Sequence, residues 1–243
     1  DLLAAPIERA ITAESGMVGY WQMYDQDNTV GFASSRSGGG SPMTFSGGVY
    51  TAPEFHVVAA PVGSGEEFAA RLNDSLVETP VMNTPVPWSV EVLVRRPDDS
   101  VDGVDSLATL RYLVDGVEIT IGINVPIVAE ATESPWYHYY ITGEQVGSDG
   151  VISAWRNGLP RTGVTYAGQT LGAFRYLSSV PSSRTDDYSM AEAAVYAGAD
   201  VDYVVHASAM LAHAGEQAHI RVIRECGFSS VPIPVVSSPL SLC

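Results

Sequence analysis

Residues 136–142 read Trp-Tyr-His-Tyr-Tyr-Ile-Thr, and residues 151–160 read Val-Ile-Ser-Ala-Trp-Arg-Asn-Gly-Leu-Pro. Aromatic and β-branched side chains favour extended strands, because they pack well on a pleated surface. Asn157 and Gly158 are residue types that adopt the positive φ of a tight primed turn. The stretch therefore predicts a strand, a connection and a β-hairpin.

The residues on either side continue this pattern. Residues 189–196 predict another strand, and Asp200 can cap a short helix over the apolar-periodic residues that follow it. A further hairpin is predicted about Asp115-Gly116, because this dipeptide is a strong turn signal. Residues 65–72 are expected to form one or two helical turns. The predicted order is a series of strands followed by one late helix.

In their order along the chain, these segments resemble the laminin-G-like domains of the concanavalin A-like lectin and glucanase superfamily. Residues 136–142 are similar to the family's W-H-H-V-A strand, Asn157-Gly158 to its V-N-G hairpin, and residues 189–196 to its A-E-V-x-V-Y strand. Near the start, residues 16–21 are similar to its opening G-L-V-G-Y-W strand. The resemblance covers roughly residues 16–212.

The resemblance implies an all-β fold: a concanavalin A-like (laminin-G-like) jelly-roll sandwich of two antiparallel sheets with one short late helix. The chain is accordingly divided into an N-terminal arm or short helix over residues 1–15, the β-sandwich over residues 16–227 and an extended tail over residues 228–243. The tail is apolar and spaced by prolines, so it cannot fold on itself. It is either a strap along its own domain or an arm that pairs with a neighbouring subunit.

The two cysteines allow two interpretations of the C-terminal region. Cys226 and Cys243 both lie near the end of the sequence, and they are either free thiols or a disulfide that ties the tail into a loop. At the other end, the sequence begins at Asp1 and shows neither the basic n-region nor the full apolar h-region of a signal peptide. A signal peptide that had been removed would leave no trace.

The charge balance is strongly acidic. Asp and Glu total 28 against 12 Lys and Arg, which gives a formal net charge of −16. Such a surface repels nucleic acid and anionic membranes, so neither is expected as a partner. No apolar run approaches the ~18 residues of a membrane-spanning helix, so no membrane insertion is expected. All 12 basic residues are arginine, which fits a GC-rich genome that avoids lysine codons, or halophilic adaptation.

Catalytic signatures are missing from the sequence. Hydrolases of this superfamily place Glu-x-Asp-x-Glu on one strand, so that alternation aims the carboxylates at a single cleft. This chain lacks that spacing, and Glu130 and Glu133 are three residues apart and would lie on opposite faces of a strand. His206 and His213 lie seven residues apart without a third metal ligand. The chain is therefore not expected to be an enzyme.

Calcium is the one cofactor that the sequence leaves open, because some laminin-G-like domains and related lectins bind it through loop oxygens. Asp25, Asp27 and Asn28 offer such oxygens in one turn, and Asp186 and Asp187 offer them in another. Ordinary turn chemistry explains both clusters equally well.

Glycan binding requires aromatic platforms beside polar groups. Strand alternation places Trp136, His138 and Tyr140 on one face of the predicted strand, and Tyr137 and Tyr139 on the other. One face must pack into the core, and the other could recognise a sugar. The sequence does not say which face does which.

The sequence leaves three hypotheses about the function. The leading hypothesis is a non-enzymatic structural and adhesion protein on a particle surface, most concretely a tailed-phage virion component such as a minor tail or capsid-surface protein. It would contact neighbouring subunits through its two ends, with scope for recognition of host glycans, at the virion surface or outside the cell. The alternatives are a secreted or cell-surface glycan-binding lectin, and a divergent glycoside hydrolase.

Overall fold

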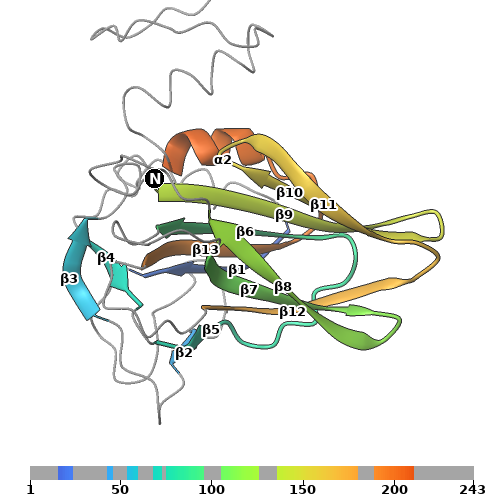
Figure 1. Cartoon of the computed structure of the whole chain (residues 1–243), viewed down its shortest axis with the longest axis horizontal. Helices are drawn as coiled ribbons and strands as arrows, with labels where there is room; N and C mark the ends of the chain where they lie inside the picture. Colours follow the sequence, from blue (N-terminus) through green and yellow to red (C-terminus); the bar gives the residue numbers. More distant parts are fainter. Residues whose placement is uncertain are drawn as a thin grey trace, which may run out of the picture.

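A computed structural model of the chain describes residues 16–23, 43–45, 54–59, 68–72, 75–95, 105–125, 136–179 and 189–210. In these residues two antiparallel sheets pack face to face, and one helix lies on the outside (Figure 1). The prediction of an all-β sandwich is confirmed.

The larger sheet has eight strands in the order β11-β10-β9-β6-β13-β4-β3, with β1 paired to β13. Its strands are β1 (Met17–Gln22), β3 (Glu54–Ala59), β4 (Phe68–Arg71), β6 (Trp88–Arg95), β9 (Trp136–Val146), β10 (Asp149–Arg156), β11 (Leu159–Tyr166) and β13 (Ser189–Ala197). The second sheet has five strands in the order β2-β5-β12-β7-β8. Its strands are β2 (Thr44–Phe45), β5 (Val77–Glu78), β7 (Asp105–Val114), β8 (Val117–Val125) and β12 (Leu171–Ser179).

The two tight turns predicted from the sequence are present. Asp115 and Gly116 join β7 to β8 with φ values of 49° and 76°, and Asn157 and Gly158 join β10 to β11 with 51° and 76°. Two successive positive φ values twist the chain in the same sense as the flanking strands, which is why these dipeptides close two-residue hairpins.

The main core lies between the sheets. The Trp88 ring on β6 lies 5.6 Å from the Tyr112 ring and 5.4 Å from the Phe174 ring of the facing sheet. Gly143 on β9 makes room for this tryptophan, because a Cβ built at residue 143 would lie 2.3 Å from the Trp88 ring. The aromatic side chain and the glycine opposite it therefore act as one packing unit.

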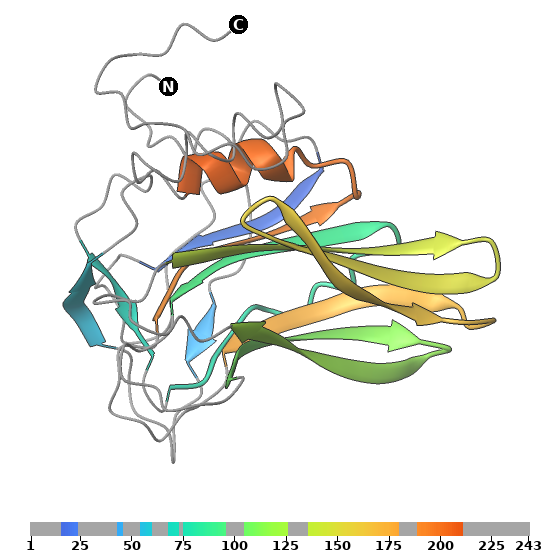
Figure 2. The same ribbon diagram turned by 45° about the horizontal axis from the view of Figure 1, so that its top comes forward.

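Helix α2 (Tyr203–Met210) covers the outer face of the eight-stranded sheet (Figure 2). The late helix is thus confirmed, but its cap is not Asp200. Asp202 precedes the helix, and its side-chain oxygen accepts a hydrogen bond from the backbone N–H of Val205 at 3.3 Å. That contact satisfies one of the N–H groups left without a partner at the start of the helix.

The prediction of helical turns at residues 65–72 is wrong for residues 68–72, the part of that range which the structure describes. Phe68–Arg71 is strand β4, and it pairs with β13 through Arg71↔Ser189 and Ala70↔Met190. Ala70 is buried, so pairing and burial in the sheet override the local preference for a helix. The arm at residues 1–15, the tail at residues 228–243, and the two cysteines Cys226 and Cys243 lie outside the described residues, so the division of the chain stays a prediction.

Candidate functional site

A buried polar cluster lies on the outer face of the eight-stranded sheet, under α2. Alternation along β6 points Glu91 to this face, while Val90 and Val92 point into the core between the sheets. The neighbouring strands bring His138 from β9 and Tyr196 from β13 to the same face. The helix adds His206 from above, so side chains from three other elements converge on the carboxylate of β6.

The Glu91 carboxylate accepts hydrogen bonds from three side chains and is completely buried. His138 Nε2 lies 2.8 Å from Oε2, and His206 Nδ1 lies 3.0 Å from each carboxylate oxygen. The Tyr196 hydroxyl donates to Oε1. An ionised carboxylate has no proton to donate, so in each contact the imidazole or the phenol is the donor. This set of donors compensates for the loss of water around a buried charge.

The cluster changes the acidity of Glu91. Burial alone would raise the pKa of this carboxyl, but the hydrogen bond from His138 and the positive charge of His206 outweigh it. Together they lower the pKa from 4.5 to about 2. Glu91 is therefore ionised throughout the physiological range. With no exposed surface, its carboxylate is not placed to exchange protons with a ligand in solvent.

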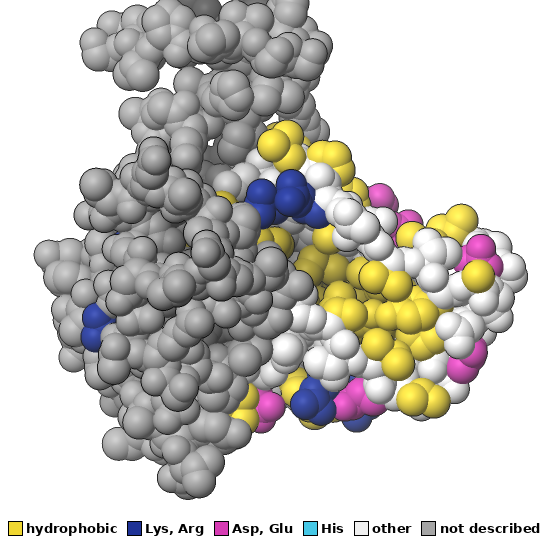
Figure 3. All heavy atoms as spheres, viewed as in Figure 1, with side chains coloured by type: hydrophobic (Ala, Val, Ile, Leu, Met, Phe, Trp, Pro, Cys, Tyr) yellow, Lys and Arg dark blue, Asp and Glu magenta, His cyan; other side chains and the backbone are white. Residues whose placement is uncertain are grey.

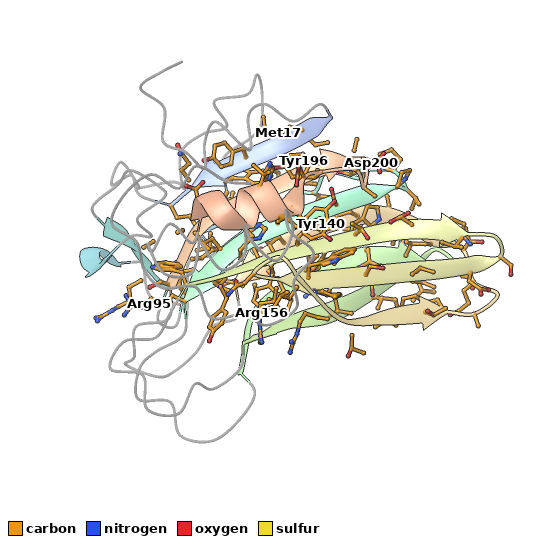
Figure 4. The ribbon with its side chains drawn as sticks, turned by 90° about the horizontal axis from the view of Figure 1, so that it is seen from above. Met17, Arg95, Tyr140, Arg156, Tyr196 and Asp200 are labelled. Atoms are coloured by element: carbon orange, nitrogen blue, oxygen red, sulfur yellow. The ribbon has the colours of Figure 1, made fainter. Side chains whose placement is uncertain are left out.

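The segment between β13 and α2 is tied to the sheet at two points. Ser89 Oγ donates to the Gly198 carbonyl at 2.7 Å, and the Tyr140 hydroxyl donates to the Ala199 carbonyl at 2.8 Å. Figure 4 looks onto this face from above and shows the labelled Tyr140 and Tyr196 on strands that α2 overlies. Together with His206, these contacts fix the helix against the sheet.

Three aromatic rings form a ledge at the side of the cluster. Tyr203, the first residue of α2, stacks on Tyr140 with ring centroids 5.1 Å apart and an interplanar angle of 10°. Trp155 on β10 lies 4.8 Å from Tyr203 and 5.4 Å from Tyr140. Tyr140 is buried, whereas Trp155 and Tyr203 are partly exposed. We call these three residues the aromatic ledge.

Polar side chains continue from the ledge along the same two strands. The register pairs Tyr140 with Trp155 and Thr142 with Ser153, so residues 142 and 153 share the outer face with the ledge. Thr142 Oγ1 lies 3.4 Å from a carboxylate oxygen of Glu144, which is two residues further along this face. Ser153 and Glu144 are partly exposed. Aromatic rings, a hydroxyl and a carboxylate thus occur together on the outer face of β9 and β10.

The five glycan-binding candidates from the sequence split between the faces as alternation predicts. Tyr137 and Tyr139 belong to the core between the sheets, and Trp136, His138 and Tyr140 lie on the outer face. All five are between 1% and 6% exposed. Both faces of this strand are therefore packed, and the burial leaves little ring surface on which a sugar could stack. Their role in glycan binding stays a prediction.

The calcium candidates Asp25, Asp27, Asn28, Asp186 and Asp187 lie outside the described residues. Within the described ranges, no group of three or more His, Cys, Asp or Glu side chains is placed to hold a metal ion. Within the same ranges, no helix is long and apolar enough to cross a membrane.

Sequence reasoning missed Glu91, Tyr196 and Trp155 as residues of the site. One signal for Glu91 was available: it is the only acidic residue in the apolar strand that runs from residue 88 to 94. No local pattern links it to its partners, because Glu91 is 47, 105 and 115 residues from His138, Tyr196 and His206.

Comparisons with known proteins give structural neighbours only. No family model matches the chain, and no curated protein matches it. The receptor binding domain of botulinum neurotoxin mosaic serotype C/D matches with a TM-score of 0.51 and 9% identity, over 79% of this chain and 50% of that one. Domain 4 of AbnA, an extracellular arabinanase from Geobacillus stearothermophilus, matches with a TM-score of 0.49 and 15% identity, over 81% of this chain and 99% of that one.

A third neighbour is Trypanosoma rangeli sialidase, with a TM-score of 0.48 and 13% identity, over 81% of this chain and 33% of that one. The chain thus spans nearly all of the arabinanase domain, half of the toxin domain and a third of the sialidase. At 9% identity the likeness to the toxin domain concerns the fold alone, and it agrees with the two-sheet sandwich. It does not single out the laminin-G-like family.

Proposed function

We propose that this chain is a non-enzymatic recognition and adhesion protein that binds a glycan on the outer face of its eight-stranded sheet. The observation that carries the proposal is the aromatic ledge, with Trp155 and Tyr203 partly exposed beside the polar side chains of Ser153 and Glu144. This is the combination of ring faces and hydrogen-bonding groups that sugar recognition needs.

The chemistry of the ledge suits a sugar ring. One face of a pyranose or furanose presents C–H groups, and the negative face of an aromatic ring attracts their partial positive charge. The hydroxyls at the sugar's rim need hydrogen-bond partners, which Ser153 and Glu144 can provide from the neighbouring positions on the strands. Because the Tyr140 hydroxyl is bonded to the backbone before α2, the ledge is held in place before any ligand arrives.

The state of Glu91 supports a role without catalysis. Glycoside hydrolases use two carboxyl groups that flank the scissile bond and exchange protons with it. Glu91 lies on a sheet face, but both of its oxygens accept hydrogen bonds from buried side chains and no part of it is exposed. Ser89 and Leu93, the residues two positions away on the same face of β6, have no carboxyl group. Glu91 is thus better suited to hold α2 than to cleave a glycan.

The proposed setting is a particle surface, most concretely the tail or capsid surface of a tailed-phage virion, with neighbouring subunits contacted through the chain ends. The lysine-free composition and the apolar, proline-spaced tail favour this setting over a free lectin. The named role of one neighbour, a toxin's receptor binding domain, offers a parallel by fold analogy for attachment by such a sandwich.

A glycan array tests the proposal with the whole chain at micromolar concentration. We expect binding by the unchanged protein, and at least tenfold weaker binding by Trp155→Ala and by Tyr203→Ala. Tyr176→Ala is the matched control, because Tyr176 is also aromatic and partly exposed but lies on β12 of the other sheet, against Arg111. Circular dichroism would verify that each variant is folded.

Two outcomes would overturn the proposal. If no glycan binds, or if Trp155→Ala binds as well as the unchanged protein, the ledge is not a sugar site. Turnover of a polysaccharide by the unchanged protein, abolished by a single carboxylate substitution, would instead favour the hydrolase alternative.

A further inference from the structure

Both sheets end on the same side of the sandwich. In the described part of the chain, β8 pairs only with β7, and β11 pairs only with β10. The Tyr112 hydroxyl of β7 lies 2.6 Å from the Tyr166 hydroxyl of β11, which places β11 across from β7 and beside the β8 edge. Along this side, two strand edges each present backbone groups that no described strand satisfies.

The side chains between these two edges are apolar and only partly covered. On β8, Val117, Ile119 and Ile121 pair with inward-facing residues of β7, so they point between the sheets. Val117 is 62% exposed, and Val164 on β11 is 42% exposed. Figure 3 shows a hydrophobic area where Figure 1 places the space between β8 and β11. We call these four residues and Tyr166 the mouth of the sandwich.

A segment near the end of the sequence has the residue pattern expected of a strand that is added to such an edge. Residues 231–236 read Val-Pro-Ile-Pro-Val-Val. In a strand, alternate residues share both the direction of their side chains and the direction of their backbone N–H and C=O groups. Val231, Ile233 and Val235 can therefore bond to an edge strand with their side chains all on one face. Pro232 and Pro234, which have no N–H, then point away from that edge, as prolines in edge strands do.

The β8 edge suits an added strand better than the β11 edge. From Ala108↔Ile123 to Val114↔Val117, β8 pairs with β7 without a shift in register. The β11 ladder has an irregularity opposite Ile152 and Ala154, and β11 carries Pro160 and Arg161, which are features that discourage strand addition. Side chains of a strand added to β8 would fall next to Ile119 and Ile121 and cover the mouth.

Residues 231–236 are separated from the described sandwich by enough chain to reach another molecule. The chain between Met210, the last described residue, and Val231 can span roughly 70 Å when extended. We infer that β8 of one copy receives residues 231–236 of a neighbouring copy as an additional antiparallel or parallel strand, which closes the mouth. This inference rests on the proposed assembly at a particle surface. Because each copy has one mouth and one such segment, two copies can exchange segments reciprocally, or successive copies can join head to tail.

Light scattering of the whole chain tests the inference through its mass in solution. We expect an assembly for the unchanged chain, and a monomer both for a chain that ends at Gly227 and for the double variant Val117→Lys, Val164→Lys. The matched control is Val146→Lys, Val205→Lys, which adds the same two charges at positions that are 59% and 50% exposed but lie on β9 and α2. The control should assemble like the unchanged chain.

Mixing two defective chains gives a sharper test. The chain that ends at Gly227 keeps its mouth, and the Val117→Lys, Val164→Lys variant keeps its tail, so an equal mixture should form a heterodimer while each alone stays monomeric. A monomeric unchanged chain, or a mixture that does not associate, overturns the inference. The lysine variants leave the aromatic ledge unchanged, so glycan binding by the monomer would separate failure of the assembly from failure of the proposed recognition.

Discussion

The two faces of the eight-stranded sheet are both buried at strand β6, but different chemistry stabilises each of them there. All eight residues of β6 are buried. On the inner face, Val90, Val92 and Val94 pack against the other sheet through apolar contacts alone. On the outer face, Glu91 takes part in a network with two histidines and a tyrosine. Adjacent residues of β6 are thus buried in different ways, the valines by apolar packing and Glu91 by hydrogen bonds.

The difference shows what each face contributes. Apolar packing is tolerant, because any side chain of similar size fills the same space with a modest loss. A buried carboxylate tolerates substitution of its partners poorly, since removal of one partner leaves a charge or a hydrogen-bond donor without compensation. The outer network therefore fixes one position of α2 on the sheet. Tyr203 at the start of that helix completes the aromatic ledge, so the network also positions the proposed glycan site.

The largest expected effect is that of Glu91→Ala. The substitution leaves the buried imidazoles of His138 and His206 and the Tyr196 hydroxyl without their shared acceptor. We expect the free energy of unfolding to fall by about 4 kcal/mol at neutral pH, because several buried polar groups lose their partner at once. Urea denaturation followed by tryptophan fluorescence measures it.

Glu118→Ala is the matched control for this prediction. Glu118 also accepts a side-chain hydrogen bond, from Arg111 at 3.0 Å, but both side chains are more than a third exposed. Its removal should change the free energy of unfolding by less than about 1 kcal/mol. Equal losses for the two substitutions would mean that the buried network contributes no more than a surface pair.

The second prediction concerns pH. The pKa of Glu91 is lowered in the folded protein, from 4.5 to about 2, so the unfolded chain binds the proton more readily. The stabilisation is complete above pH 4.5 and is lost as the pH falls toward 2. It amounts to about 3 kcal/mol. Across this window the difference in unfolding free energy between the unchanged protein and Glu91→Gln should shrink by about that amount.

Comparison with Glu91→Gln removes the contribution of the many exposed carboxyl groups, which titrate in both proteins. Histidines of the unfolded chain are already protonated below pH 5, so they add little to the change. A difference that stays constant from pH 7 to pH 2.5 would contradict the assigned environment of Glu91.

Much of the fold follows from local signals. The Asn157-Gly158 and Asp115-Gly116 hairpins form where these dipeptides predict them, because their backbone preferences depend on two residues only. The alternation of residues 136–141 between two faces also follows from the geometry of a strand. The wrong prediction at Phe68–Arg71 arises from long-range rather than local interactions. Strand β4 forms because β3 and β13 pair with it.

The site was much harder to predict than the fold. An outward-facing Glu91 on a strand of a sandwich is ordinarily a solvated residue, and only the presence of α2 above it makes it a buried one. Likewise, a helix histidine such as His206 is exposed or buried according to what lies below the helix, and here it is 1% exposed. Such a cluster is assembled by contacts across more than 100 residues, and single-sequence patterns carry no information on these.

Among the buried positions, the smallest expected effect is that of Val92→Ala, which tests the inner face one residue away from Glu91. Val92 is 1% exposed in the core between the sheets, and truncation removes two methyl groups and leaves a small cavity. We expect a loss of about 2 kcal/mol in the free energy of unfolding. The loss should be the same at pH 7 and pH 3, because no titrating group is involved. A pH-dependent loss would mean that the two faces are coupled through β6, and that the inner core cannot be treated apart from the polar network.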